Sequence, residues 1–269
     1  MSSREYILDS TSEPGREQLG SLPMLLDAPT REVLEGVGIQ PGRRCLDIGA
    51  GDGSIARWLA ERTGPAGGVV AVDVDTDHLV GRPGVEVLRH DINDGVPSGG
   101  PFDVIHARLV LLHLSRREEI LNDLVEALAP GGWLVIGEYG DRLPYALSAA
   151  SRADMETFDR IQHIGHHVIG AAAGQSIQWA HQVEAHMDAS GLVDIHAIEH
   201  SHTSTGGGTG CLYHRSLIVQ IEAPLLAAGV TADEFERYCD LLLDPRFRAW
   251  FYQFICTRGR KPLLAPTSR

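Results

Sequence analysis

The order of apolar and polar residues predicts alternating strands and helices up to about residue 140. Gly68–Asp73 (GVVAVD) is a continuous β-branched run, which is typical of a strand buried on both faces of a sheet. Other short apolar runs predict strands at Arg44–Gly49, Val85–Arg89, Phe102–His106 and Trp133–Glu138. Apolar residues at helical spacing predict helices over 53–63 and 115–128. Strands and helices that alternate across short Gly-rich joints favour a doubly wound α/β fold with a mostly parallel sheet.

The predicted helix over 115–128 carries its own start and stop signals. Ser115 and Glu118 have the spacing of a capping box, in which each side chain bonds the backbone of the other. The run Pro130-Gly131-Gly132 is expected to end this helix.

The second half of the chain has a different pattern. Helical spacing runs from Met155 to Val168, and residues 192–202 have the composition of a strand. Helices are predicted near 212–228 and 232–243, the second opened by a capping box of Thr231 and Glu234. Residues 249–258 predict a final strand. No internal repeat or domain-sized linker interrupts the chain, so we expect a single domain.

Composition narrows the class of protein. The 269 residues carry a net charge of −13, which disfavours binding to nucleic acid or to an anionic membrane. There is no run of 18 apolar residues and no apolar segment near the start, so we expect a soluble protein of the cytoplasm. The four cysteines form no CxxC pair, which argues against a metal cluster or a disulfide framework.

The most informative segment is Asp47–Gly53 (DIGAGDG), between the first predicted strand and the first helix. Glycines let a backbone turn tightly and approach a ligand. The spacing is GxGxG, and Ser54 stands where the dinucleotide fingerprint GxGxxG has its last glycine. No GKS or GKT follows, so a phosphate-binding P-loop is excluded.

Two further acids follow the next two predicted strands. Asp73 ends the second strand, where a carboxylate can accept hydrogen bonds from both hydroxyls of a ribose. Asp91 lies in the loop after the third strand, where the exocyclic amine of an adenine would lie. The carboxyl ends of parallel strands form the ligand-binding edge of such a sheet. Each acid alone could equally be a turn or cap residue.

Five segments together resemble the class I S-adenosylmethionine-dependent methyltransferases, in the small-molecule branch that includes the ubiquinone and menaquinone biosynthesis type. They are CLDIGAGDGS (45–54), VVAVDVD (69–75), VEVLRHDIND (85–94), FDVIHARLVLLHL (102–114) and LAPGGWLVIGEY (128–139). The resemblance implies a seven-stranded Rossmann-like sheet with a reversed C-terminal hairpin and a helical lid. It divides the single domain into an N-terminal helical cap (1–35), a cofactor-binding core (36–140), a lid and acceptor segment (141–190) and C-terminal edge strands and helices (191–269).

The resemblance also implies a site for S-adenosylmethionine, with S-adenosylhomocysteine as the product. Asp47 would help to place the amino group of the methionine part, under which Gly49 and Gly51 pass with Ala50 between them. Asp73 would bind the ribose. The remaining implied contacts are Val74 against the adenine, Asp91 and the Ile92 amide at the adenine edge, and the backbone of His106 and Ala107 near the sulfonium.

Histidine suits a general base, because its reference pKa of about 6.5 lies near working pH. His163, His166 and His167 lie in one predicted helix, in the stretch that covers the acceptor pocket in similar proteins. They could equally form an exposed face of that helix. His106 and Arg108 follow the fourth strand, where Arg108 could hold a carboxylate or pair with a neighbouring acid.

We therefore expect a methyltransferase for a small-molecule acceptor in specialised metabolism, without a metal. Two alternatives stay open: an enzyme of the same fold that uses the bound cofactor for cyclisation or decarboxylation, and an NAD-dependent oxidoreductase. The apolar N-terminal segment also leaves self-association into a homo-oligomer open.

Overall fold

The computed structural model describes residues 12–79 and 81–263, and the chain divides into two compact units. Of the described residues, the sheet unit comprises 29–79, 81–138, 179–198 and 255–263. The helix-rich unit comprises 12–28, 139–178 and 199–254. Within the described ranges, no helix is long and apolar enough to cross a membrane.

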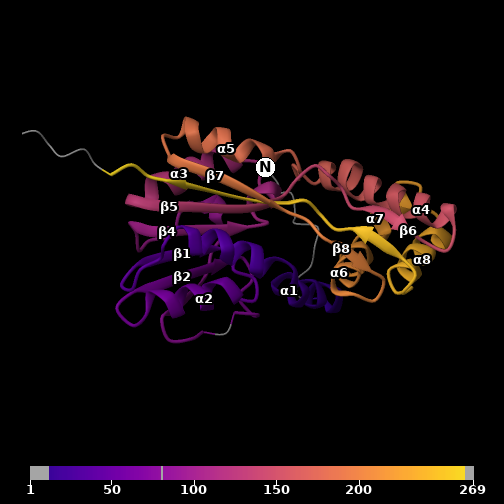
Figure 1. Cartoon of the computed structure of the whole chain (residues 1–269), viewed down its shortest axis with the longest axis horizontal. Helices are drawn as coiled ribbons and strands as arrows, with labels where there is room; N and C mark the ends of the chain where they lie inside the picture. The colour runs from indigo at the N-terminus through magenta and orange to yellow at the C-terminus, as the bar shows by residue number, and fades with distance from the viewer. Residues whose placement is uncertain (1–11, 80, 264–269) are drawn as a thin grey trace, which may run out of the picture. The chain divides into compact units, whose positions relative to one another are not determined.

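The sheet unit is built on seven strands (Figure 1). In spatial order they are β3 (Val85–Arg89), β2 (Gly68–Asp73), β1 (Arg44–Ile48), β4 (Phe102–Arg108), β5 (Leu128–Tyr139), β10 (Phe254–Arg260) and β7 (Val193–His200). The first five run parallel, and the sequence order reverses from β1 to β4. Ligands bind open α/β sheets at such a switch point, outside the carboxyl ends of the strands.

The reversal of strand direction that breaks the parallel sheet occurs at its last two strands, β10 and β7. The N–H of Gly131, near the start of β5, donates to the carbonyl of Lys261 at the end of β10, and the N–H of Lys261 donates to Gly132. Arg260 of β10 pairs with Asp194 at the start of β7, so β7 lies antiparallel to β10 at the edge. The expected α/β class, the mostly parallel sheet and the reversed C-terminal strand are confirmed.

Helices cover the sheet because its strands are apolar on both faces. Leu46 and Ile48 of β1 belong to a buried cluster with residues of α3 (Arg117–Ala127) and α5 (Trp179–Ala189), and their neighbour Cys45, on the opposite face, is also buried. The helix α2 (Ser54–Thr63) packs on β1, β2 and β3. The final turns of α1 (Glu13–Gly36) add the buried Val33 and Leu34 to this unit.

The helix-rich unit has its own core, which periodicity alone did not predict. Phe158, Tyr238 and Phe247 are fully buried; the ring of Phe158 stacks on that of Tyr238 at 5.3 Å and lies tilted against that of Phe247 at 5.0 Å. The unit holds a small antiparallel sheet of β6 (Tyr145–Ser148), β9 (Arg248–Trp250) and β8 (Thr203–Thr205). Its helices besides α1 are α4 (Arg152–His163), a π-helix (Ile164–Gly170), α6 (Thr209–Gln220), α7 (Glu222–Ala227) and α8 (Ala232–Leu241).

Two predicted helix signals are wrong for α3. The helix begins at Arg117 after Arg116, with no side-chain cap, so Ser115 lies outside it; a 3₁₀ turn at Leu111–His113 precedes it and shifts its start. Pro130-Gly131-Gly132 do not end the helix, which stops at Ala127, but belong to β5. A Cβ at Gly132 would lie 2.9 Å from the Phe102 carbonyl oxygen, so this glycine permits close strand pairing. The capping box of Thr231 and Glu234 is confirmed at α8.

The predicted strand 249–258 is two strands in different sheets. β9 ends at Trp250 and β10 begins at Phe254. Residues 251–253 are as buried as the strands on either side, so the sequence pattern gives no sign that one strand ends and another begins there. The other predicted C-terminal strand, 192–202, is confirmed in its central part as β7.

Candidate functional site

The glycine turn after β1 has a backbone that only glycine adopts readily. Gly49, Gly51 and Gly53 have φ values of 63°, 57° and 77°, in the left-handed region. A Cβ added at Gly49 would also overlap the Cγ2 atom of Val110, from the loop after β4. Because these positions carry no Cβ, the backbone of the turn can approach its neighbours closely at the carboxyl edge of the sheet.

Asp73 is fixed to this turn by a hydrogen bond. The N–H of Gly51 donates to Oδ2 of Asp73 at 2.9 Å, and the N–H of Asp75 donates to Oδ1 at 3.1 Å. Burial raises the pKa of Asp73, and these N–H groups oppose the shift. The two acceptor oxygens are held beside the glycine turn, with lone pairs left for a ribose. Next to it, the apolar side chain of Val74 is 59% exposed, which leaves a surface that an adenine ring would cover.

Asp91 lies at the carboxyl end of the next strand, β3. It is exposed, and its Oδ1 accepts the backbone N–H and the side-chain amide of Asn93, both at 2.9 Å. It thereby caps the short 3₁₀ helix Ile92–Asp94, whose first residue is buried. The cap role of Asp91 is confirmed, and its contact with an adenine stays a prediction.

A buried pair joins β1 to β4. Asp47 and His106 are register partners, and Nδ1 of His106 lies 2.7 Å from Oδ1 of Asp47. A carboxylate oxygen only accepts, so Nδ1 of His106 donates to Asp47. Asp47 Oδ2 and His106 Nε2 are buried with no hydrogen-bond partner among the described residues. Both side chains are closed to solvent, so the pair ties β1 to β4 just before the glycine turn.

The family comparison agrees with this geometry. A methyltransferase domain family matches residues 25–199, which is more than half of the chain. The chain belongs to this family. The resemblance to class I S-adenosylmethionine-dependent methyltransferases is thereby confirmed.

Individual relatives are distant. A ubiquinone/menaquinone biosynthesis C-methyltransferase of Ectopseudomonas mendocina is 31% identical over 119 residues, which are 40% of this chain and 46% of that protein. A trans-aconitate 2-methyltransferase of Mycobacterium tuberculosis is 25% identical over 181 residues, 66% of this chain and 67% of that protein. The chain thus spans less than half the length of the first relative.

A solved structure supports the fold. Phosphoethanolamine N-methyltransferase 2 of Haemonchus contortus, in complex with phosphomonomethylethanolamine and S-adenosylhomocysteine, superimposes with a TM-score of 0.57. It is 19% identical, and the match covers 97% of this chain and 61% of that chain.

The residues of this methyltransferase domain fit an adenosyl amino acid better than a dinucleotide. Asp52, just before α2, accepts the N–H of Ser54 at 3.0 Å and pairs with Arg57 at 3.1 Å. The N–H of Ser54 at that helix end is therefore already bound to a carboxylate and is not available to a pyrophosphate. S-adenosylmethionine, the cofactor expected for this family, has no phosphate.

The proposed catalytic residues lie in both units. Arg108, in the sheet unit, has Nη1 3.3 Å from the hydroxyl of Thr30, and this bond does not involve an acid. The other three candidates, His163, His166 and His167, lie in the helix-rich unit. His163 and His167 are exposed with ring centroids 4.7 Å apart, as their i,i+4 spacing predicts. His166 instead has Nε2 2.8 Å from the hydroxyl of Tyr252.

Sequence reasoning missed Glu138. This buried acid lies near the end of β5, and burial raises its pKa to about 8. A usable signal was present, because an acid that ends an apolar strand is a candidate for the ligand-binding edge, as Asp73 was.

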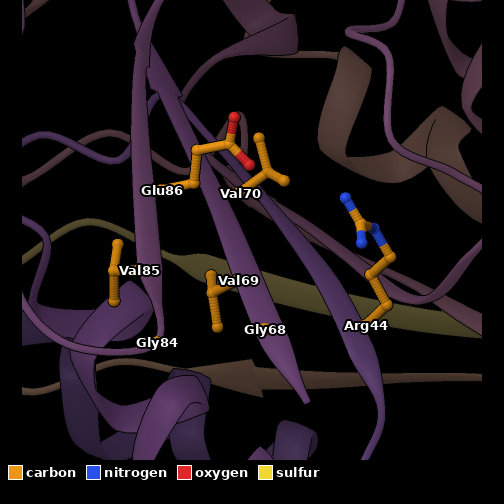
Figure 2. A pocket seen from close by; sticks show the side chains of 7 residues that line it. All are labelled: Arg44, Gly68, Val69, Val70, Gly84, Val85 and Glu86. Carbon is orange, nitrogen blue, oxygen red and sulfur yellow. The ribbon is translucent and has the colours of Figure 1, made fainter. Parts of the chain in front are cut away.

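An open depression lies at the side of the sheet opposite the glycine turn, where the parallel strands begin. Figure 2 shows that residues at the amino ends of β1, β2 and β3, among them Arg44 and Glu86, line it. The glycine turn and Asp73 lie at the carboxyl ends of the same strands, so this depression is not the cofactor site.

Proposed function

We propose that the protein binds S-adenosylmethionine and transfers its methyl group to a small-molecule acceptor. The observation that carries the proposal is the glycine turn after β1, in which Gly49, Gly51 and Gly53 have left-handed φ values and Asp73 accepts the N–H of Gly51. By name, the two relatives above act on small molecules, which supports a small acceptor. We further propose a role in specialised metabolism.

The bound cofactor supplies a methyl group on a positively charged sulfur, which is already activated for in-line transfer. The domain's own residues would bind the cofactor and orient it. Asp47 accepts the ammonium group, Asp73 accepts the ribose hydroxyls, and Val74 covers the adenine with Asp91 and the Ile92 amide at its edge. The backbone of His106 and Ala107 lies at the carboxyl end of β4, near the sulfur. Orientation of this kind contributes on the order of 7–11 kcal/mol to rate.

Among the candidate bases, His166 is favoured by its contact. Its ring is half-buried and hydrogen-bonded to the hydroxyl of Tyr252, which fixes the ring's orientation, whereas His163 and His167 are exposed. It also lies in a π-helix, an element frequent at functional sites. We propose that His166 takes the proton of an acceptor that must lose one, and that Arg108 holds an acceptor carboxylate.

Calorimetry with S-adenosylhomocysteine and with NAD tests the binding step. We expect binding of the first and none of the second, and the reverse would overturn the proposal. Mass analysis after incubation of candidate acceptors with methyl-labelled S-adenosylmethionine tests the reaction. A labelled product supports methyl transfer, whereas an unlabelled, rearranged product would favour a cyclase or decarboxylase of the same fold.

A further inference from the structure

Glu138 connects the end of β5 to the loop that follows β4. Its side chain is fully buried, and Oε1 accepts the N–H groups of Leu111 at 2.9 Å and of Leu112 at 3.2 Å. These two residues open the 3₁₀ turn Leu111–His113. The first N–H groups of a helical turn have no partner within it, so the carboxyl group satisfies donors that the backbone leaves free.

The same loop continues to the glycine turn. Leu109 has a φ of 56°, which is rare outside glycine, and its N–H donates to the carbonyl of Gly137 at 2.8 Å. The next residue, Val110, packs so closely on Gly49 that any Cβ there would overlap it. Loop residues 109–112 are thus bonded to β5 on both sides of Val110, by Gly137 before it and Glu138 after it.

We propose that Glu138 is a positioning residue for the cofactor: its carboxyl group holds the loop after β4 so that Val110 supports the Gly49 turn. This rests on the proposed function of that turn. Glu138 does not need to touch the cofactor, because it acts through the two N–H groups and Val110. Nothing in the family match assigns this role to Glu138.

The charge of Glu138 makes the role testable. Burial raises its pKa to about 8, while the N–H groups of Leu112, Leu111 and Val110 and the charge of Arg117 oppose the shift. The Cys256 thiol of β10 also senses Glu138; burial raises the pKa of this thiol to about 12, so it stays neutral. A charged carboxylate accepts N–H bonds about twice as strongly as a neutral acid, so the loop is held better above pH 8 than below.

The experiment measures the affinity of the full chain for S-adenosylhomocysteine by calorimetry. Glu138→Leu cannot accept the two bonds and is expected to weaken binding by about tenfold or more at pH 7. Glu138→Gln keeps an acceptor oxygen and should stay within about threefold of wild type. Glu86→Gln, an exposed acid at the other edge of the sheet, is the matched control and should change nothing.

A double-mutant cycle tests the path through the loop. Val110→Ala should weaken binding on its own, and combined with Glu138→Leu it should cost no more than the larger single effect, because both act on one contact. Fully additive losses would overturn the path. So would Glu138→Leu binding within twofold of wild type, or Glu138→Gln losing as much as Glu138→Leu.

A pH comparison decides the matter if Glu138→Leu does not fold, which urea unfolding would reveal. Relative to Glu138→Gln, whose side chain does not titrate, wild-type affinity should rise at least about twofold between pH 7 and pH 9. The ligand's own titration cancels in this ratio. Parallel pH profiles would overturn the inference. A wild-type protein that binds no S-adenosylhomocysteine would instead overturn the proposed function.

Discussion

The carboxylate of Asp73 accepts the N–H of Gly51 at 2.9 Å, although the two residues lie 22 positions apart. This bond joins the end of β2 to the glycine turn after β1, beside the proposed cofactor site. The bond contributes to stability because Asp73 is partly buried, and its carboxylate would be left unsatisfied without the N–H groups of Gly51 and Asp75.

Replacing this carboxylate should weaken cofactor binding. Asp73→Ala removes hydrogen bonds to a charged group worth roughly 1.5–3 kcal/mol, so the dissociation constant for S-adenosylhomocysteine should rise by about 10- to 150-fold. The control is Asp77→Ala, four residues along, whose side chain is exposed and pairs only at the surface with Arg89. An unchanged constant for Asp73→Ala would remove this residue from the site.

Gly49→Ala should damage both stability and binding. The left-handed backbone costs a residue with a Cβ about 1–2 kcal/mol, and the new methyl group would overlap Val110. Gly68→Ala has open space and an ordinary backbone, so its urea midpoint should match wild type. Adding Val110→Ala to Gly49→Ala should restore part of the lost stability, because it removes the overlap but not the backbone cost. Equal midpoints for both glycine variants would contradict the close contact.

His214, in the helix-rich unit, should be replaceable by phenylalanine with a gain in stability. The ring is 1% exposed, both its nitrogens are buried without a partner among the described residues, and it packs against the ring of Tyr252 at 5.0 Å. His214→Phe keeps the ring contacts and removes the unsatisfied atoms, so we expect a gain of about 1 kcal/mol or more at pH 7 by urea unfolding.

The pH dependence of this variant gives a second measurement. Burial lowers the pKa of His214 to about 3, from 6.5 in the unfolded chain. The unfolded state therefore binds the extra proton, and stability is complete above pH 6.5 and is lost as pH falls toward 3. His214→Phe should lose less stability than wild type between pH 7 and pH 5. His196→Phe, at an exposed position, should follow wild type, and identical slopes for His214→Phe would show that His214 is not buried as described.

Once an acceptor is known, alanine variants of His163, His166 and His167 should differ in turnover. His166→Ala should lower kcat by about 10²- to 10⁴-fold if it is the general base, and Tyr252→Phe, which removes its hydrogen-bond partner, should lower kcat by less. His163→Ala and His167→Ala should retain turnover, because both side chains are exposed. Full turnover in all three alanine variants would remove the histidines from catalysis.

The sequence alone determined the parts of this protein that depend on local physics. Buried parallel strands are mostly apolar, so β1 to β4 were predicted close to their observed positions, whereas β5 begins at Leu128 and not at the predicted Trp133. A positive φ strongly favours glycine, so Gly49 and Gly51 marked the ligand edge. Acids at Asp73 and Asp91 followed because parallel strands end at one edge. Predicted element boundaries were wrong where a residue typical of one structure serves another, as at Gly132, which permits strand pairing and does not end a helix.

Only the tertiary structure decided what depends on contacts between distant residues. The pairing of Asp47 with His106 and of Glu138 with the loop after β4 joins positions 59 and 27 residues apart, and no spacing rule predicts which donor meets which acceptor. The division of 249–258 between two sheets likewise depends on the neighbours that β9 and β10 find. Periodicity specifies which faces are buried, whereas the pairing of buried polar groups depends on the completed packing.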